Sequence, residues 1–297
     1  MTARYALLTL GIAGLSMAGI FYSLAHAPVV TMVAYRMVFA ALLMLPVAFV
    51  ARGSGAAQTR VPFTRTDLWT TAGAGALFAF DLVIWAMSLK FTSVASAALF
   101  VSTHPIFVAL LAWLIFRERP TPLILAGIAI GIIGIAIVAR HDVLLSGRAL
   151  IGDGLALLAA LAETGYLLCG RSVRRRIDAP RYALGVYASC AAFVCVAALG
   201  TGAGFAISAH DLGLAIGLAV VATVLGHTLV SQSLGYMPAA VVAVSFLAQP
   251  LMAAVFALMF LGQVIPLTTA LGGLVALAGI GVVAYANERQ PTEPLEM

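Results

Sequence analysis

Long runs of apolar residues, separated by short polar connections, fill almost the whole chain of 297 residues. A helix needs about 20 apolar residues to cross a hydrocarbon core of roughly 30 Å, and ten runs reach this length. These runs are residues 5–24, 29–50, 68–89, 93–116, 122–139, 150–170, 182–201, 212–231, 238–262 and 267–286. The pattern predicts an all-α integral membrane protein with ten transmembrane helices, whose function lies within the helix bundle.

The second half of the chain repeats part of the first half. Residues 86–138 overlay residues 231–283 without a gap, at a constant offset of 145. The overlay aligns Ser88-Leu89 with Ser233-Leu234, Pro105 with Pro250, Gly127 with Gly272 and Gly134 with Gly279. Because an odd number of spans separates the copies, the second copy is turned upside down in a bilayer. We expect two inverted five-helix repeats, residues 1–145 and residues 146–297, the second with a short C-terminal tail. This is a common architecture of secondary transporters.

The amino-acid composition also indicates a membrane environment. Hydrophobic residues make up 63% of the chain, charged residues 9%, and the mean hydropathy is +1.10, which leaves too little polar surface for a water-soluble protein. The first run is too long for a signal peptide, and another span follows it at once. The three cysteines lie in or beside spans without metal or disulfide spacing, so we interpret them as core residues and expect no cofactor. They are Cys169, Cys190 and Cys195.

The positive charges predict the orientation. If the N-terminus is cytoplasmic, the inner connections and termini hold twelve arginines, and the outer connections hold only Lys90, Arg140 and Arg148. Both termini are therefore expected in the cytoplasm. We interpret the net charge of +5 as anchoring to the inner leaflet of the membrane, and we expect no nucleic-acid partner. One lysine against fifteen arginines indicates a GC-rich bacterial genome, hence a multi-pass protein of the bacterial inner (plasma) membrane.

A few ionisable or strongly polar side chains lie inside the predicted spans, where a buried charge is costly and usually functional. Counting about 1.5 Å of rise per residue groups them by depth. The outer pair is Arg36 with Asp81, the central pair is His104 with Gln249, and the inner pair is Glu163 with His227. We predict that the outer and inner pairs gate a central substrate site. Alternatively, Arg36 extends its charge to the interface, and the histidines have structural roles only.

Asp81 shares one helix face with Phe78, Trp85 and Ser88, at spacings of three and four residues. A carboxylate flanked by aromatic rings suits a substrate with an ammonium group. An aromatic stripe of this kind is also typical of packing or of an interface belt.

The aligned prolines predict helix kinks. Proline removes one backbone hydrogen bond, so Pro105 is expected to free the carbonyl of Val101, and Pro250 that of Phe246. Each carbonyl is either a ligand or hinge near the middle of the membrane, or part of a static kink.

Small residues dominate the fifth and tenth spans. The sequence Gly127-x-x-x-Gly131 is a close-packing motif for helices in lipid. It is expected to join either the two halves of the chain or two subunits, so the sequence is compatible with a monomer or a homodimer.

Two stretches resemble the repeats of EamA-type transporters of the drug/metabolite transporter superfamily. They are "WAMSLKFTSVASAALFVSTHPIFVALLAWLIFRERPTPLILAGIAIGIIG" from Trp85 and "GHTLVSQSLGYMPAAVVAVSFLAQPLMAAVFALMFLG" from Gly226. The resemblance implies a ten-helix bundle with a central cavity. It also implies alternating-access transport of a small organic metabolite, often export of an amino acid or related compound, commonly in exchange for protons.

The resemblance also bears on single residues. Arg36 and Glu118 match an arginine of the second helix and an acidic residue after the fourth. Gln249 and Gln263 stand where second repeats often have glutamate, which leaves Asp81, Glu163 and the histidines as candidates for proton coupling.

Two other classes of membrane protein remain as alternatives. A multispan enzyme acting on lipid needs clustered catalytic groups or metal ligands, but no His-x-x-x-His, cysteine pair or phosphate-binding loop is present. A channel is expected to show a repeated filter or a ring of like charges. The sequence therefore favours a transporter over an enzyme, with a small-molecule substrate, the lipid bilayer and protons as its partners.

Overall fold

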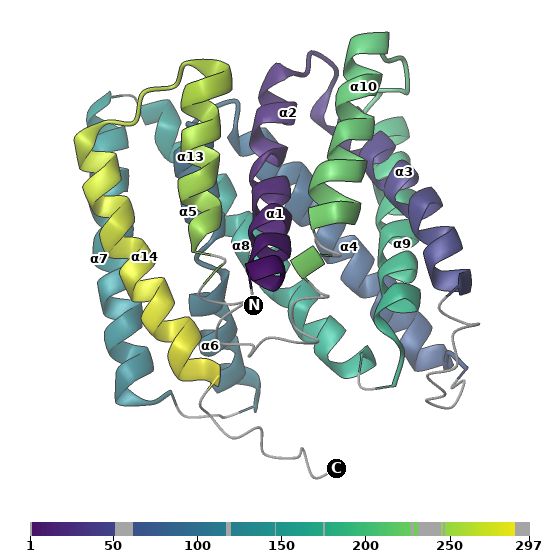
Figure 1. The fold of residues 1–297 in the computed structure, drawn as a ribbon, viewed down its shortest axis with the longest axis horizontal. Helices are drawn as coiled ribbons and strands as arrows, with labels where there is room; N and C mark the ends of the chain where they lie inside the picture. Colours follow the sequence, from purple (N-terminus) through teal and green to yellow (C-terminus); the bar gives the residue numbers. More distant parts are fainter. Residues whose placement is uncertain are drawn as a thin grey trace.

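The computed structural model describes residues 2–50, 62–116, 120–145, 147–174, 176–226, 229–230, 245 and 247–288. Every regular element among these residues is a helix (Figure 1). The first half contains α1 (Thr2–Ser16), α2 (Ala18–Leu24), α3 (Val29–Val50), α4 (Arg65–Ser88), α5 (Val94–Val101), α6 (His104–Phe116) and α7 (Pro122–Leu145). The second half contains α8 (Gly147–Val173), α9 (Ala179–Gly200), α10 (Ala209–Gly217), the π-helix η1 (Leu218–Leu225), α13 (Ala248–Leu261) and α14 (Leu267–Glu288).

Eight helical segments are long and apolar enough to cross a membrane: Ala6–Leu24, Val29–Phe49, Arg65–Ser88, Val94–Leu111, Pro122–Ala139, Gly147–Gly170, Ala179–Gly200 and Leu267–Ala286. Each corresponds to one predicted span. The predicted spans 212–231 and 238–262 correspond to the shorter apolar helices Ala209–Leu225 and Ala248–Leu261, and residues 231–244 lie outside the described part of the chain. The described part of the chain is thus all-helical, with helices that have the length and composition of membrane spans.

The two prolines lie at helix starts, which corrects the prediction of kinks inside helices. The predicted fourth span breaks at residues 102–103, and α6 begins at His104, so Pro105 lies in its first turn. Pro250 likewise lies in the first turn of α13. A first-turn residue has no hydrogen-bond partner for its N–H, so proline is tolerated there. Phe246 lies outside the described residues.

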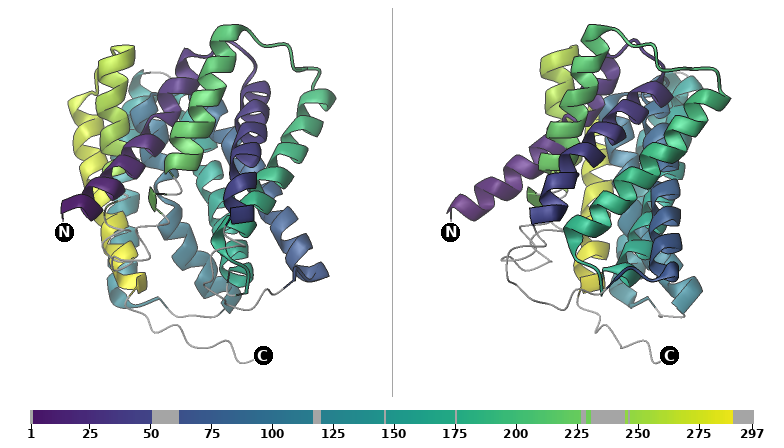
Figure 2. Two further views of the ribbon diagram at one scale, coloured as in Figure 1. Left: turned by 45° about the vertical axis from the view of Figure 1, so that its right-hand side comes forward. Right: turned by 90° about the vertical axis from the view of Figure 1, so that its right-hand side faces the viewer.

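The connections gather at two ends of the bundle. We name the end with residues 62–67 and 174–181 the arginine end; there Arg176 Nη1 lies 3.4 Å from Asp67 Oδ2. The opposite end contains the connections 25–28, 89–93, 201–208 and 262–266. In Figure 1 the arginine end is at the bottom and the opposite end at the top, and Figure 2 shows the N-terminal part of α1 leaning out of the bundle.

Helices α7 and α14 pack against each other along their length. A Cβ atom added to Gly127 would lie 2.9 Å from the carbonyl oxygen of Gly279, and one added to Gly134 would lie 2.7 Å from that of Gly272. Since the earlier residue of α7 meets the later residue of α14, the two helices are antiparallel. We call this contact the glycine seam. It shows that the small-residue motif joins the two halves of one chain.

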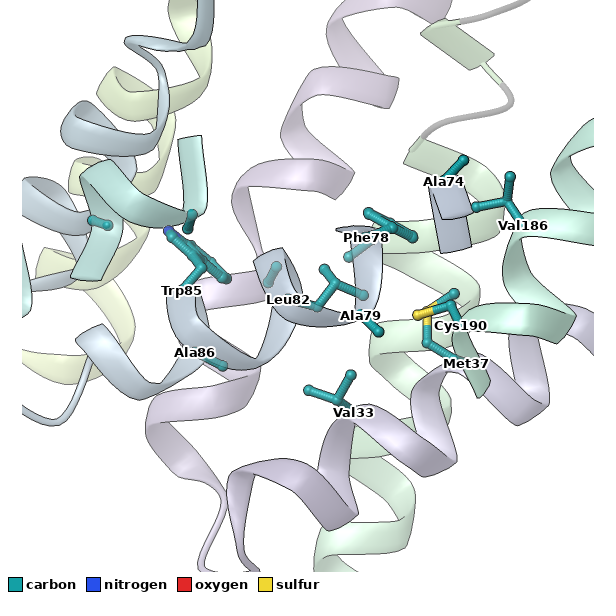
Figure 3. Close-up of a cluster of buried hydrophobic side chains, with 14 of the residues drawn as sticks. Val33, Met37, Ala74, Phe78, Ala79, Leu82, Trp85, Ala86, Val186 and Cys190 are labelled. Carbon is teal, nitrogen blue, oxygen red and sulfur yellow. The ribbon is translucent and has the colours of Figure 1, made fainter. Parts of the chain in front are cut away.

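A large apolar core lies between α3, α4 and α9. Figure 3 shows Val33 and Met37 of α3 facing α4, with Cys190 of α9 beside Met37 and Val186 of α9 beside Ala74 of α4. None of the three cysteines forms a disulfide; Cys190 is completely buried, and Cys169 and Cys195 are partly buried. The core therefore places one face of α4 in the interior, where Asp81 is surrounded by protein.

Candidate functional site

Helix α4 brings the predicted aspartate into the centre of the bundle. Its start is fixed by a capping box, in which the Thr64 hydroxyl accepts a hydrogen bond from the backbone N–H of Asp67 and the Asp67 carboxylate accepts one from Thr64 N–H. Packing against α3, α5, α8 and α9 covers the helix on several sides. The predicted polar and aromatic face, which comprises Phe78, Asp81, Trp85 and Ser88, is buried.

Arg36 of α3 is buried, with 3% of its surface exposed, so it does not extend its charge to the interface. Its Nε donates to Thr223 Oγ1 at 2.9 Å, and its Nη1 donates to the Tyr22 hydroxyl at 3.3 Å. Thr223 belongs to the π-helix η1, and its hydroxyl donates to the carbonyl of Leu218 at 3.0 Å. Short π-helical segments often occur at functional sites.

Arg36 and Asp81, which were grouped by depth, do not form a direct ion pair. Among the described residues, no ion pair or hydrogen bond reaches the carboxylate of Asp81, although only 5% of this residue is exposed. Arg36 and Glu163 are both close enough to act on Asp81 electrostatically. Instead, the guanidinium of Arg36 donates its hydrogen bonds to the oxygens of Thr223 and Tyr22.

Glu163 of α8 pairs with His104 of α6. Glu163 Oε2 lies 3.6 Å from His104 Nδ1, and about a quarter of each side chain is exposed. The hydroxyl of the neighbouring Thr164 donates to the carbonyl of His104 at 3.3 Å, which fixes the start of α6 against α8. The predicted inner and central layers are therefore wrong as drawn, because His104 and Glu163 lie together.

The other two members of those layers are His227 and Gln249. His227 is outside the described residues. The backbone carbonyl of Gln249 accepts a hydrogen bond from Ser16 Oγ of α1 at 3.1 Å. The depth estimate failed here because the position along a straight helix gives a height in the bilayer but not the direction in which a side chain points. In addition, α8 is longer than its predicted span.

Aromatic rings surround this polar centre. Phe78 stacks on Tyr166 with 4.9 Å between ring centroids, and on Tyr187 with 6.3 Å. Trp85 meets Tyr22 edge to face at 6.1 Å. The sequence analysis missed Tyr22, Tyr166 and Tyr187, although the position of Tyr166 three residues after Glu163, on the same helix face, was an available signal. It also missed Thr223.

The bundle is tightly packed between this centre and the opposite end. Small and apolar side chains of α2, α5 and α13 form one buried cluster: Ile20, Val94, Ala98, Ala253 and Ala257. The Gln263 side-chain oxygen accepts a hydrogen bond from the backbone N–H of Val94 at 3.2 Å and so joins the end of α13 to the start of α5. The side chain of Gln263 thus helps to hold this end of the bundle together.

Comparison with known proteins shows the family. The model of the EamA-like transporter family matches residues 3–140 and residues 150–285. This chain belongs to the EamA-like transporter family. The family is part of the drug/metabolite transporter superfamily, so the protein is a membrane transporter. Glu118, which matches an acidic residue of EamA-type proteins, lies outside the described residues.

Two other proteins and a solved structure are similar to the chain. An uncharacterized transporter of Archaeoglobus fulgidus is 24% identical over 252 residues, which cover 83% of this chain and 84% of the relative. An uncharacterized transporter of Synechocystis sp. is 35% identical over 77 residues, or 26% of this chain and 23% of the relative. One crystal structure matches with a TM-score of 0.65 and 17% identity, covering 97% of this chain and 99% of its own. That structural likeness concerns the fold alone.

Proposed function

We propose that this EamA-like transporter moves a small metabolite with an ammonium group, an amino acid or a related compound, out of the cell in exchange for protons. One observation carries the proposal. Asp81 is a buried carboxylate without a hydrogen-bond donor among the described residues, and it lies on a face lined by aromatic rings. A buried charge of this kind needs a proton or a cationic partner. A substrate ammonium group supplies that partner, and the rings stabilise it further.

Arg36 supplies the complementary charge. A guanidinium has five N–H donors, and the hydrogen bonds to Thr223 and Tyr22 use only Nε and Nη1. The remaining donors suit a carboxylate of the substrate. An α-amino acid carries both charges, so Arg36 and Asp81 together favour a zwitterion over a simple cation.

Proton coupling is assigned to the pair of Glu163 and His104. Their 3.6 Å contact joins two side chains that can each carry a proton. Glu163 also acts electrostatically on Asp81. A proton on Glu163 lowers the negative charge near Asp81 and so weakens the hold on a bound ammonium group. Substrate release and proton uptake are thereby linked.

Alternating access is proposed to use two inverted five-helix halves. Three features support this. Repeat-related glycines face each other in the antiparallel glycine seam, the aligned prolines both lie in a first helical turn, and the family model matches each half of the chain. The tightly packed opposite end would be the closed outer side of the inner membrane, and the arginine end would face the cytoplasm, following the positive charges.

Transport into proteoliposomes tests the proposal. A radiolabelled amino-acid mixture is supplied with and without an imposed pH gradient to the wild type, Asp81→Asn and Asp178→Asn. Asp178 caps α9 at the arginine end, and asparagine caps helices about as well as aspartate, so Asp178→Asn is the matched control. We expect gradient-stimulated uptake by the wild type and the control and its loss in Asp81→Asn, with substrate recovered chemically unchanged.

Two results would contradict this proposal. Wild-type rates in Asp81→Asn would remove Asp81 from the substrate path. Absence of uptake of every amino acid by the wild type would exclude the proposed substrate class.

A further inference from the structure

Helices α4 and α10 begin in the same way at the two ends of the bundle. In each, the third residue is a buried aspartate: Asp67 in α4 and Asp211 in α10. The N-cap hydroxyl of Thr64 accepts a hydrogen bond from Asp67 N–H at 3.1 Å, and that of Ser208 accepts one from Asp211 N–H at 3.0 Å. The two starts lie 144 residues apart, almost the offset of the internal repeat.

The partners of the two aspartates differ. Asp67 faces the guanidinium of Arg176 at 3.4 Å. Asp211 faces two imidazoles instead: Asp211 Oδ1 lies 3.4 Å from His210 Nδ1 and 3.9 Å from His26 Nδ1. The ring centroids of His26 and His210 are 5.7 Å apart. One end therefore has an ordinary salt bridge, and the other has two histidines around a carboxylate.

We propose that His26, His210 and Asp211 form a binding site for a divalent transition-metal ion such as Zn²⁺. Their ligand atoms all lie within 4.8 Å of one another. Metal–ligand bonds of about 2.0–2.1 Å in a tetrahedron place ligand atoms about 3.3 Å apart, close to the 3.4 Å already present between His210 and Asp211. Two imidazoles and one carboxylate suit Zn²⁺ and its neighbours better than Mg²⁺ or Ca²⁺.

The carboxylate is held in place for this role. Asp211 Oδ1 accepts a hydrogen bond from the backbone N–H of His26 at 3.0 Å, and Oδ2 accepts one from Ser208 Oγ at 3.0 Å. The two imidazoles are much freer, with 85% of the His26 side chain and 59% of the His210 side chain exposed. A rigid carboxylate and two adjustable imidazoles at the aqueous surface give the ion an entry path and leave a fourth position for water.

The site joins the two halves of the chain. His26 lies in the connection between α2 and α3 of the first half, and His210 and Asp211 open α10 of the second half. Helix α10 leads directly into η1, whose Thr223 accepts a hydrogen bond from Arg36. A bound ion ties these segments together and so stabilises the arrangement with the packed opposite end.

Metal binding to purified, tag-free protein tests the inference without any transport measurement. Zn²⁺ is titrated by calorimetry, and Co²⁺ is followed by its visible absorption, in the wild type, His26→Gln and His210→Gln. His141→Gln is the control, because it removes a histidine of α7, far along the chain from this cluster. Both test residues are exposed, so circular dichroism and gel filtration should match the wild type.

We expect one equivalent of metal per chain in the wild type and in His141→Gln, an increase in melting temperature on binding, and binding weakened at least about tenfold in His26→Gln and in His210→Gln. Equal affinity in all four proteins, or no stoichiometric binding to the wild type, would overturn the inference. Because binding is measured directly, these outcomes do not depend on whether the proposed substrate is correct.

Discussion

The glycine seam and the centre around Asp81 are built from opposite kinds of residue. Along residues 122–139 and 267–286 the chain has no charged side chain, and the backbones of α7 and α14 touch at glycines. The centre instead combines buried charges with aromatic rings, and its aspartate has no donor among the described residues. Close backbone packing gives a contact that has one arrangement. In the centre, by contrast, polar groups without a full set of partners can change their arrangement when a ligand binds.

This difference predicts two classes of variant. Changes in the seam should reduce the stability of the fold, whereas changes in the centre should reduce transport and leave stability nearly intact. The following variants test the distinction, beginning with the largest expected effect.

Gly279→Ala should prevent stable folding. Its Cβ would lie 2.2 Å from the backbone nitrogen of Gly131 and 2.6 Å from the carbonyl oxygen of Gly127, and backbone atoms cannot move aside as a side chain does. We expect a loss of at least about 3 kcal/mol, seen as aggregation in gel filtration. Gly273→Ala on the same helix is the control, since its Cβ meets only the end of the Leu99 side chain at 3.5 Å. Equal behaviour of the two variants would mean that the seam is looser than described.

Asp81→Asn should abolish transport without lowering the melting temperature. The carboxylate has no donor to lose among the described residues, and removing a buried charge also removes its desolvation cost. Thermal unfolding and proteoliposome uptake are measured on the same preparation. A fall of several degrees in melting temperature would show that Asp81 has a structural partner and would weaken its assignment to the substrate site.

Glu163→Gln should retain substrate exchange but lose its response to a pH gradient. The substitution removes the carboxylate to which proton coupling is assigned in the proposal, 3.6 Å from His104 Nδ1. His104→Gln should give the same phenotype, and the double variant should be no worse than either single one, because both substitutions break one interaction. Additive losses would indicate that the two residues act separately.

Thr223→Val should have the smallest effect among the central variants. It removes the acceptor for Arg36 Nε, a hydrogen bond to a charged group worth about 1.5–3 kcal/mol, but Tyr22 still holds Nη1. We expect a KM increase of about tenfold with little change in maximal rate. Thr201→Val is the control, because that hydroxyl bonds, within the described part of the chain, only to the end of its own helix. A change confined to maximal rate would place Arg36 in the conformational step.

Several features of the fold could be predicted from the sequence because they are local. Span length and apolar composition identified every described membrane helix, and the aligned glycines identified the two helices that form the seam. The aligned prolines were expected inside helices but lie at helix starts. The aligned pairs Gly127 with Gly272 and Gly134 with Gly279 face each other across the seam in crossed order. The choice between a seam within the chain and one between subunits needed the structure.

The pairing of the central residues was decided by the tertiary structure alone. Helical periodicity fixes which residues share a face, and it correctly grouped Phe78, Asp81 and Trp85. It does not fix how two helices are rotated and tilted toward each other. Arg36 meets Thr223 across 187 residues of chain, and Glu163 meets the histidine at the start of a broken helix. The sequence thus determined which groups enter the membrane, and packing determined which of them meet, because side-chain contacts depend on the relative orientation of helices that are distant in the chain.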